Sequence, residues 1–270
     1  MVSFSSRLVQ WAGSLAVAFV LLLSGSLPAN AATLQVAPVS VSILPMQTAQ
    51  SLWLSNTGND TIHAQVRVFR WLQKGGQNLY EGTTDLLISP PFLMLEPGQR
   101  RLVRVMRAGS VGVSAGNAGT KPADRTPLDT VEAQREKSYR LIVDELPVSG
   151  YSENVNFVMQ YSIPVFLPAE NNPPRKPTLH WKLQNEPGSQ ALVVTNMGTI
   201  RGQLADVKLI SATGKAFELQ RGLLGYVLPG ATMHWRIPFA MPGAAAQYTI
   251  EALLNGVVTR DIQLSESVAP

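Results

Sequence analysis

The sequence predicts an all-β protein built from antiparallel sandwiches, and three observations support this fold class. Short stretches alternate apolar and polar residues with the two-residue period of a strand, as at Val39, Val41 and Ile43. Proline and glycine are frequent, with 19 and 21 copies in 270 residues, and they mark turns between these stretches. No long segment carries the 3.6-residue apolar period of an amphipathic helix.

The first half of the chain contains enough strand-like stretches for one complete antiparallel sandwich. These stretches are residues 39–43, 52–54, 66–71, 86–88, 102–106, 139–143 and 155–166. Residues 108–137 are rich in Gly, Ala, Ser and Thr, which predicts a mobile loop. The second half adds strand-like stretches at residues 192–194, 205–210, 235–238 and 248–252. No internal repeat between the two halves is evident from the sequence.

The predicted organisation is a signal peptide, two domains and a linker. Arg7 precedes an apolar run from Leu15 to Leu23, and a small-x-small cleavage pattern ends at Ala31. The run is shorter than the ~20 residues that span a bilayer, so we expect cleavage and no stable membrane insertion, with a retained anchor as the alternative. Four prolines in residues 168–177 predict a stiff linker. The expected units are a signal peptide (1–31), a first domain (32–167), the linker (168–177) and a second domain (178–266).

The composition excludes several chemistries. Without cysteine, the chain has neither disulfides nor thiolate metal sites. The formal charge of +4 falls to +3 when Arg7 leaves with the signal, which is too small to indicate nucleic acid as a partner. His63, His180 and His234 lie far apart without ligand spacing, so we expect no metal and no cofactor.

Catalytic motifs are also missing from the sequence. No serine lies in a nucleophile elbow, and no glycine-rich phosphate loop is present. The adjacent carboxylates Asp144 and Glu145 follow a strand, where neighbouring side chains point to opposite faces. This pair therefore predicts an ion pair or a turn contact at a strand end, and we expect no enzyme activity.

The most informative stretch is the strand at residues 155–166, because one of its faces is apolar. Val155, Phe157, Met159, Tyr161 and Ile163 recur with the two-residue period of a strand. The stretch directly precedes the linker, where the last strand of a domain lies and can form a sheet edge. It either fills its own core or is lent to another protein across that edge.

An ordered set of residues resembles the periplasmic chaperones of the chaperone-usher pathway, and specifically the archaic branch that serves spore-coat-like pilus subunits. The matching residues are Pro38–Val39, Leu52–Asn56, Trp71, Ser89–Pro91, Leu95–Gln99, Val103–Val105, Tyr139–Pro147, Tyr161–Phe166 and, in the second half, Gly225–Gly230. The set spans nearly the whole expected first domain.

The resemblance implies two immunoglobulin-like sandwich domains of the pilus chaperone type and a periplasmic location. It implies that the protein binds and stabilises pilus subunits by donor-strand complementation and delivers them to an outer-membrane usher. The pairing of chaperone and pilin is itself a standard case of strand addition. On this basis Val155, Phe157, Met159, Tyr161 and Ile163 are the expected donor residues.

One feature of the better-known chaperones is missing. They anchor the terminal carboxylate of the subunit with an arginine on the first strand and a lysine on the last strand of the first domain. Matched to this sequence, these positions fall at about Ser40 and at Ile163 or Pro164, none of which can pair with a carboxylate. Arg140 and Arg104 are the candidate replacements, and a solvated or intradomain ion pair is the alternative for each.

Two other classes of protein remain open from the sequence. A structural surface protein, such as a pilus subunit, would be one incomplete sandwich and often disulfide-bonded, whereas this chain has two predicted domains and no cysteine. A secreted enzyme or carbohydrate-binding β protein would need an acid–base pair or an aromatic platform, and neither is evident.

Overall fold

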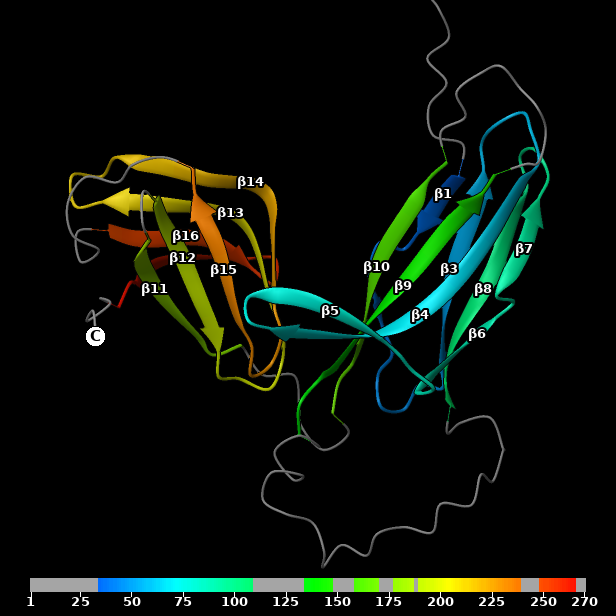
Figure 1. Ribbon diagram of the computed structural model, residues 1–270, viewed down its shortest axis with the longest axis horizontal. Coiled ribbons are helices and arrows are strands. Elements are labelled where there is room, and N and C mark those ends of the chain that lie inside the picture. Colours follow the sequence, from blue (N-terminus) through cyan, green and yellow to red (C-terminus); the bar gives the residue numbers. More distant parts are fainter. Residues whose placement is uncertain are drawn as a thin grey trace, which may run out of the picture. The chain divides into compact units, whose positions relative to one another are not determined.

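The computed structural model describes residues 34–108, 134–147, 158–169, 177–186, 189–238 and 248–265. All its named elements are β-strands, and they form two sandwiches, one from β1–β10 and one from β11–β17 (Figure 1). The predicted all-β class is therefore confirmed. The expected signal peptide, residues 1–31, lies outside the described residues. Within the described residues, no helix is long and apolar enough to cross a membrane.

The first sandwich contains a four-stranded sheet in the order β1-β3-β8-β6 and a six-stranded sheet in the order β2-β10-β9-β4-β5, with β7 also paired to β4. Its strands are β1 (Leu34–Ala37), β2 (Val41–Ser42), β3 (Ala49–Asn56), β4 (Ile62–Lys74), β5 (Gln77–Gly82), β6 (Leu86–Ser89), β7 (Phe92–Leu95), β8 (Arg100–Arg107), β9 (Lys137–Leu146) and β10 (Gln160–Leu167). All pairs are antiparallel except β2 with β10.

The core of the first sandwich lies between its two sheets, because alternate residues of each strand point inward. Leu52 and Leu54 of β3 are fully buried, as are Val103 and Val105 of β8. Leu141 of β9 meets them from the other sheet. Burial of each such side chain contributes about 1.5–3 kcal/mol, which explains why the alternating stretches of the sequence become strands.

The second sandwich contains a three-stranded sheet in the order β11-β12-β15 and a four-stranded sheet in the order β14-β13-β16-β17. Its strands are β11 (Leu179–Glu186), β12 (Ser189–Asn196), β13 (Gly202–Ser211), β14 (Ala216–Val227), β15 (Thr232–Ile237), β16 (Tyr248–Leu254) and β17 (Val257–Gln263). Leu192, Val194, Leu204, Leu209 and Ile250 are fully buried in its core.

Asn56, the last residue of β3, holds two turns of the first sandwich together. Its side-chain Nδ2 donates to the carbonyls of Asp60 at 2.7 Å and Leu95 at 2.9 Å, and its Oδ1 accepts from the Gly58 amide at 2.9 Å. Its carbonyl also accepts from the Gly98 amide at 3.0 Å. Asn56 is only 1% exposed, so these bonds replace water for a buried polar side chain.

Asn196, the last residue of β12, repeats this arrangement in the second sandwich. Its Nδ2 donates to the carbonyls of Ile200 at 2.8 Å and Val227 at 2.9 Å, and its Oδ1 accepts from the Gly198 amide at 2.9 Å. Its carbonyl accepts from the Gly230 amide at 2.8 Å. The expectation that the halves share no repeat is therefore wrong in this respect. Both contain an Asn-x-Gly turn joined to an x-Pro-Gly turn.

Candidate functional site

Strand β10 has an open edge. On one side β9 pairs with it along all of Gln160–Leu167. On the other side β2 pairs only with Val165 and Phe166. Among the described residues, 160–164 therefore have a strand partner on one side only. Such an edge presents unpaired backbone groups that can template another strand, and Pro164 within it fits the restriction of proline to sheet edges.

The inward face of β10 is divided between two environments. Ile163 is 4% exposed and belongs to the core of the first sandwich. Tyr161 packs against that core, and its hydroxyl donates to the Leu34 carbonyl. For these two predicted donor residues, the structure supports a place in the protein's own core, which the sequence left as the alternative.

Met159 shares the alternation of Tyr161 and Ile163 but is not part of the described core cluster. Its amide donates to Glu145 Oε2 at 3.2 Å, and its carbonyl accepts from the Glu145 amide at 2.8 Å. Residue 159 is therefore still hydrogen-bonded to β9, although β10 itself begins at Gln160. Its neighbour Val158 is 51% exposed. Val155 and Phe157, the two other predicted donor residues, lie outside the described residues. The apolar alternation in the sequence thus extends upstream of Tyr161 and Ile163, the two residues that pack in or against the core.

The anchor positions of the better-known chaperones lie beside this edge. Ser40 is exposed and directly precedes Val41, which pairs with Val165 of β10. Arg140 of β9 lies opposite Pro164 in the β9–β10 register. The Arg140 guanidinium is therefore carried by the strand next to the one on which the missing lysine would lie.

The two candidate arginines do not come together. Arg104 is exposed on β8, opposite Ser51 of β3 and Ser89 of β6, in the four-stranded sheet. Arg140 belongs to the six-stranded sheet. A single carboxylate bound beside β10 would meet Arg140 and not Arg104.

Arg140 is held by aromatic rings. Its guanidinium carbon lies 3.8 Å from the centre of the Trp71 ring and 5.6 Å from that of Tyr226. Its Nη1 donates to the Ser162 carbonyl at 3.3 Å. Burial lowers the pKa of Arg140, while Tyr80 and Tyr226 oppose this shift. The group stays charged, because an arginine pKa lies far above any physiological pH.

Arg140 has no carboxylate partner among the residues that the structure describes, and its buried Nε has no hydrogen-bond partner there. The intradomain ion pair expected as the alternative is not observed for Arg140 among these residues, and the nearby Glu145 carboxylate accepts from the Met159 amide. The predicted strand-end ion pair is confirmed for Asp144, whose Oδ2 lies 2.8 Å from Arg67 Nη2. A partly buried guanidinium is thus free to bind an added carboxylate.

The rings around Arg140 form a small apolar cluster. Trp71 and Phe166 from the first sandwich meet Tyr226, Leu228 and Ala231 from the second, and all five are buried. Ring centres lie 5.4 Å apart for Trp71–Tyr226 and 5.9 Å apart for Phe166–Tyr226. The sequence does not indicate this cluster, because its members are far apart in the chain and none has a distinctive local pattern.

The Gln73 side chain hydrogen-bonds to the backbone of the segment that carries Tyr226. Its Nε2 donates to the Tyr226 carbonyl at 2.9 Å, and its Oε1 accepts from the Leu228 amide at 2.8 Å. These bonds fix Tyr226 against β4, which also carries Trp71. The two rings that contact Arg140, those of Trp71 and Tyr226, are therefore in place before any ligand binds, which lowers the entropy lost on binding.

Glu136 and Arg201 make a second charged contact near Phe166. Glu136 Oε2 lies 2.6 Å from Arg201 Nη1, and the Arg201 guanidinium lies 3.6 Å from the Phe166 ring centre. The Glu136 amide donates to the Thr199 carbonyl at 2.8 Å. Residues 109–133 of the predicted mobile loop lie outside the described residues. The prediction is wrong at the end of that loop, because Glu136 is 6% exposed and packed.

The buried Glu136 predicts a specific pH dependence. Burial raises the pKa of its carboxyl above the ordinary 4.5, and Arg201 opposes this shift without cancelling it. The folded state therefore holds this proton more tightly, so the stability contributed by Glu136 is fully present below the unfolded pKa and falls as pH rises through the folded pKa.

Glu136→Gln removes this titration. We expect the difference in unfolding free energy, wild type minus Glu136→Gln, to fall as pH rises from 3.5 to 7 in denaturant titrations of both proteins. A difference that grows with pH would mean that Arg201 dominates and that the folded pKa is depressed.

Comparison with known families matches a segment of the first half of the chain to one family. Residues 33–116 match the family described as pili and flagellar-assembly chaperone, PapD N-terminal domain. No curated protein sequence matches the chain at a significant level.

Solved structures extend the likeness to both sandwiches. The CsuC–CsuE chaperone–tip adhesion subunit complex of the archaic Csu pili of Acinetobacter baumannii is 25% identical, with a TM-score of 0.61 over 87% of this chain and 99% of that chain. The Pseudomonas aeruginosa CupB2 chaperone is 17% identical, with a TM-score of 0.53 over 86% of this chain and 100% of that chain. The Salmonella enterica SafA pilin–SafB chaperone complex is 16% identical, with a TM-score of 0.54 over 86% of this chain and 94% of that chain.

The two sandwiches and the family match define the class of protein as a pilus chaperone, as the sequence resemblance implied. The family match over residues 33–116 and the likeness of both sandwiches to solved chaperones support this class, and the likeness to CsuC supports the archaic branch.

Proposed function

We propose that this protein is a periplasmic chaperone that binds pilus subunits by lending them a strand and delivers them to an outer-membrane usher. The open edge of β10, with apolar alternation continuing past its own core, is the observation that carries the proposal. The CsuC–CsuE structure contains a chaperone with a tip adhesion subunit, which supports a pilus subunit as the partner here. The expected signal peptide, cleaved near Ala31, would place the chain in the periplasm.

The proposed mechanism is strand addition. A subunit that lacks one strand exposes an apolar groove, and Val155, Phe157 and Met159 fill pockets of that groove. Backbone hydrogen bonds along the edge supply affinity, and the alternating side chains supply specificity. Tyr161 and Ile163 hold the other end of the same strand in the chaperone's core. In this mechanism the chaperone holds the donor strand at Tyr161 and Ile163, while the residues upstream of them fill the groove of the subunit.

Arg140 is the proposed anchor for the terminal carboxylate of the subunit. Its position opposite Pro164, its partly buried charge without a carboxylate partner among the described residues, and its unpartnered Nε support this role. A carboxylate would satisfy the Nε and form a two-pronged contact. Arg104, exposed on the other sheet, is the weaker candidate.

Arg140→Ala should weaken subunit binding by about 1.5–3 kcal/mol, the range for hydrogen bonds to charged groups. It should also lower stability by roughly 0.5–2 kcal/mol, because the contact with Trp71 is lost. Arg140→Lys should recover only part of the affinity, since lysine cannot form the fork. Affinity and melting temperature are measured on the same proteins.

Arg104→Ala is the matched control and should leave both quantities within about 0.5 kcal/mol of the wild type. A loss of stability without a loss of affinity in Arg140→Ala would remove Arg140 from the binding site. The role of Arg140 would then be limited to stabilising the fold through its contact with the Trp71 ring.

Copurification separates the chaperone from the two alternative classes. A tagged chain isolated from the periplasm of pilus-producing cells should bring with it a small, single-domain β protein. A pilus subunit would instead be incorporated into fibres, and a secreted enzyme or carbohydrate-binding protein would be isolated alone. The domain limits 32–167 and 178–266 stay predictions, since the strands themselves end at Leu167 and begin again at Leu179.

A further inference from the structure

A basic pocket lies beside the aromatic surroundings of Arg140, with which it shares Trp71 and Gln73. Its volume is about 140 Å³, and it is lined by residues 70–73, 135–138 and 228–231. Arg140 and Ser162 are not among its lining residues. A pocket of this size has room for several waters or for one small polyatomic ion.

The charges of this pocket are not balanced. Arg70, Arg135 and Lys137 line it, and none of them has an ion-pair partner in the part of the chain that the structure describes. Glu136 also lines it, but its carboxylate is already paired with Arg201 at 2.6 Å. Like charges that converge on one concave site raise its positive potential and concentrate anions there.

One buried polar group in the pocket lacks a partner. Ser138 is 6% exposed and lines the pocket, and its Oγ makes no hydrogen bond to any described residue. Nearly all buried hydroxyls have a partner, so this one points to a bound group that the protein chain does not supply. A hydroxyl beside guanidinium and ammonium groups can donate to an anionic oxygen.

We propose that the basic pocket binds a small, doubly charged tetrahedral oxyanion of the phosphate or sulfate class. The lining carries three cations and one anion, a net charge of +2, which such an oxyanion neutralises. The guanidinium groups of Arg70 and Arg135 can each donate two parallel hydrogen bonds to a pair of its oxygens, and the Lys137 ammonium adds a further positive charge. The ion would join Arg70, Arg135 and Lys137 of the first sandwich beside the 228–231 turn of the second.

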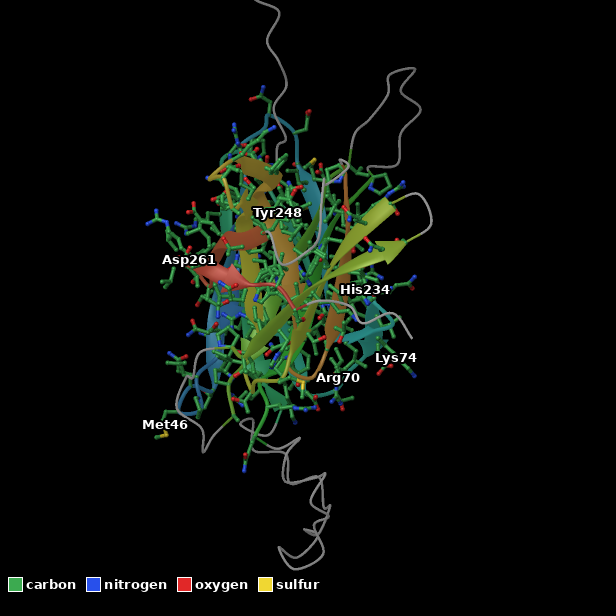
Figure 2. The ribbon with its side chains drawn as sticks, turned by 90° about the vertical axis from the view of Figure 1, so that its left-hand side faces the viewer. Met46, Arg70, Lys74, His234, Tyr248 and Asp261 are labelled. Carbon is green, nitrogen blue, oxygen red and sulfur yellow. The ribbon has the colours of Figure 1, made fainter. Side chains whose placement is uncertain are left out.

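The test is a calorimetric titration of the purified mature chain with sodium phosphate at pH 8, with ionic strength held constant by sodium chloride. We expect saturable binding by the wild type and at least tenfold weaker binding by the double variant Arg135→Gln/Lys137→Gln. The matched control is Arg101→Gln/Lys74→Gln, which removes the same charge from exposed residues outside the pocket. Lys74 lies on the same strand as Arg70, and both are labelled in Figure 2.

Two further measurements make the result specific. Ser138→Ala should weaken phosphate binding, with its melting temperature in chloride alone unchanged, because its hydroxyl has no partner to lose. Acetate, with one charge, should bind at least tenfold more weakly than phosphate. No saturable phosphate binding, equal binding by the pocket double variant and its control, or equal affinity for acetate would each overturn the proposal.

Discussion

Met159→Asp is expected to abolish capture of the pilus subunit while leaving the chaperone folded. Met159 is not part of the core of the first sandwich, so the change removes no core packing. In the complex the same side chain would enter an apolar groove, where an unpaired carboxylate is strongly unfavourable. The readouts are the periplasmic level of the subunit and the melting curve of the purified chaperone. Phe157→Asp should act in the same way.

Val158→Asp is the matched control for this prediction. Val158 directly precedes Met159, is 51% exposed and has the opposite parity in the apolar alternation. We expect its substitution to leave the subunit level close to that of the wild type. Normal accumulation of subunit with Met159→Asp, or an equal loss with Val158→Asp, would show that the donor face is assigned wrongly.

Asn56→Ala and Asn196→Ala are expected to be the most destabilising single substitutions among those considered. Each removes two side-chain bonds to backbone carbonyls and one bond from a backbone amide, all made by an asparagine that is itself buried. Leaving a buried polar group unsatisfied costs about 1–3 kcal/mol. We expect each variant to lose about 3 kcal/mol of unfolding free energy in denaturant titrations followed by intrinsic fluorescence.

The control for the asparagine substitutions is Asn185→Ala. Asn185 is exposed, and its side chain accepts a single bond from Gln190 at 3.0 Å. Its loss should cost less than about 0.5 kcal/mol. If Asn56→Ala and Asn196→Ala each lose less than 1 kcal/mol, the two buried asparagines do not hold the turns as the geometry indicates.

The strands that the sequence predicts are mainly those with two or more buried residues at alternate positions. In β3, β8 and β9 this alternation is regular, since one face meets the core. Strands β5 and β17 were missed because nearly all their residues are exposed or half-buried, so no apolar period marks them. Strand β14 was missed for a different reason, since Gly222 and Gly225 interrupt it with positive φ angles.

The candidate site was only partly predictable. The apolar alternation of residues 155–163 is local and visible in the sequence, but the point where core packing ends, between Tyr161 and Met159, depends on the opposite sheet. Arg140 was recognised as a candidate, while its stacking on Trp71 and its neighbour Tyr226 depends on contacts between distant segments. The shared asparagine turns have a sequence signal, Asn-x-Gly with x-Pro-Gly, but the bonds that join the two turns of each pair depend on contacts between distant segments.

Amide hydrogen exchange on the copurified complex tests strand addition most directly. Exchange is compared between free and subunit-bound chaperone for peptides that cover residues 155–164, with the edge strand β17 as an internal reference. Strand addition predicts strong new protection along residues 155–164 in the complex and unchanged exchange in β17. A stable complex in which residues 155–164 exchange as rapidly as in the free chaperone would contradict the assignment of this edge as the binding site.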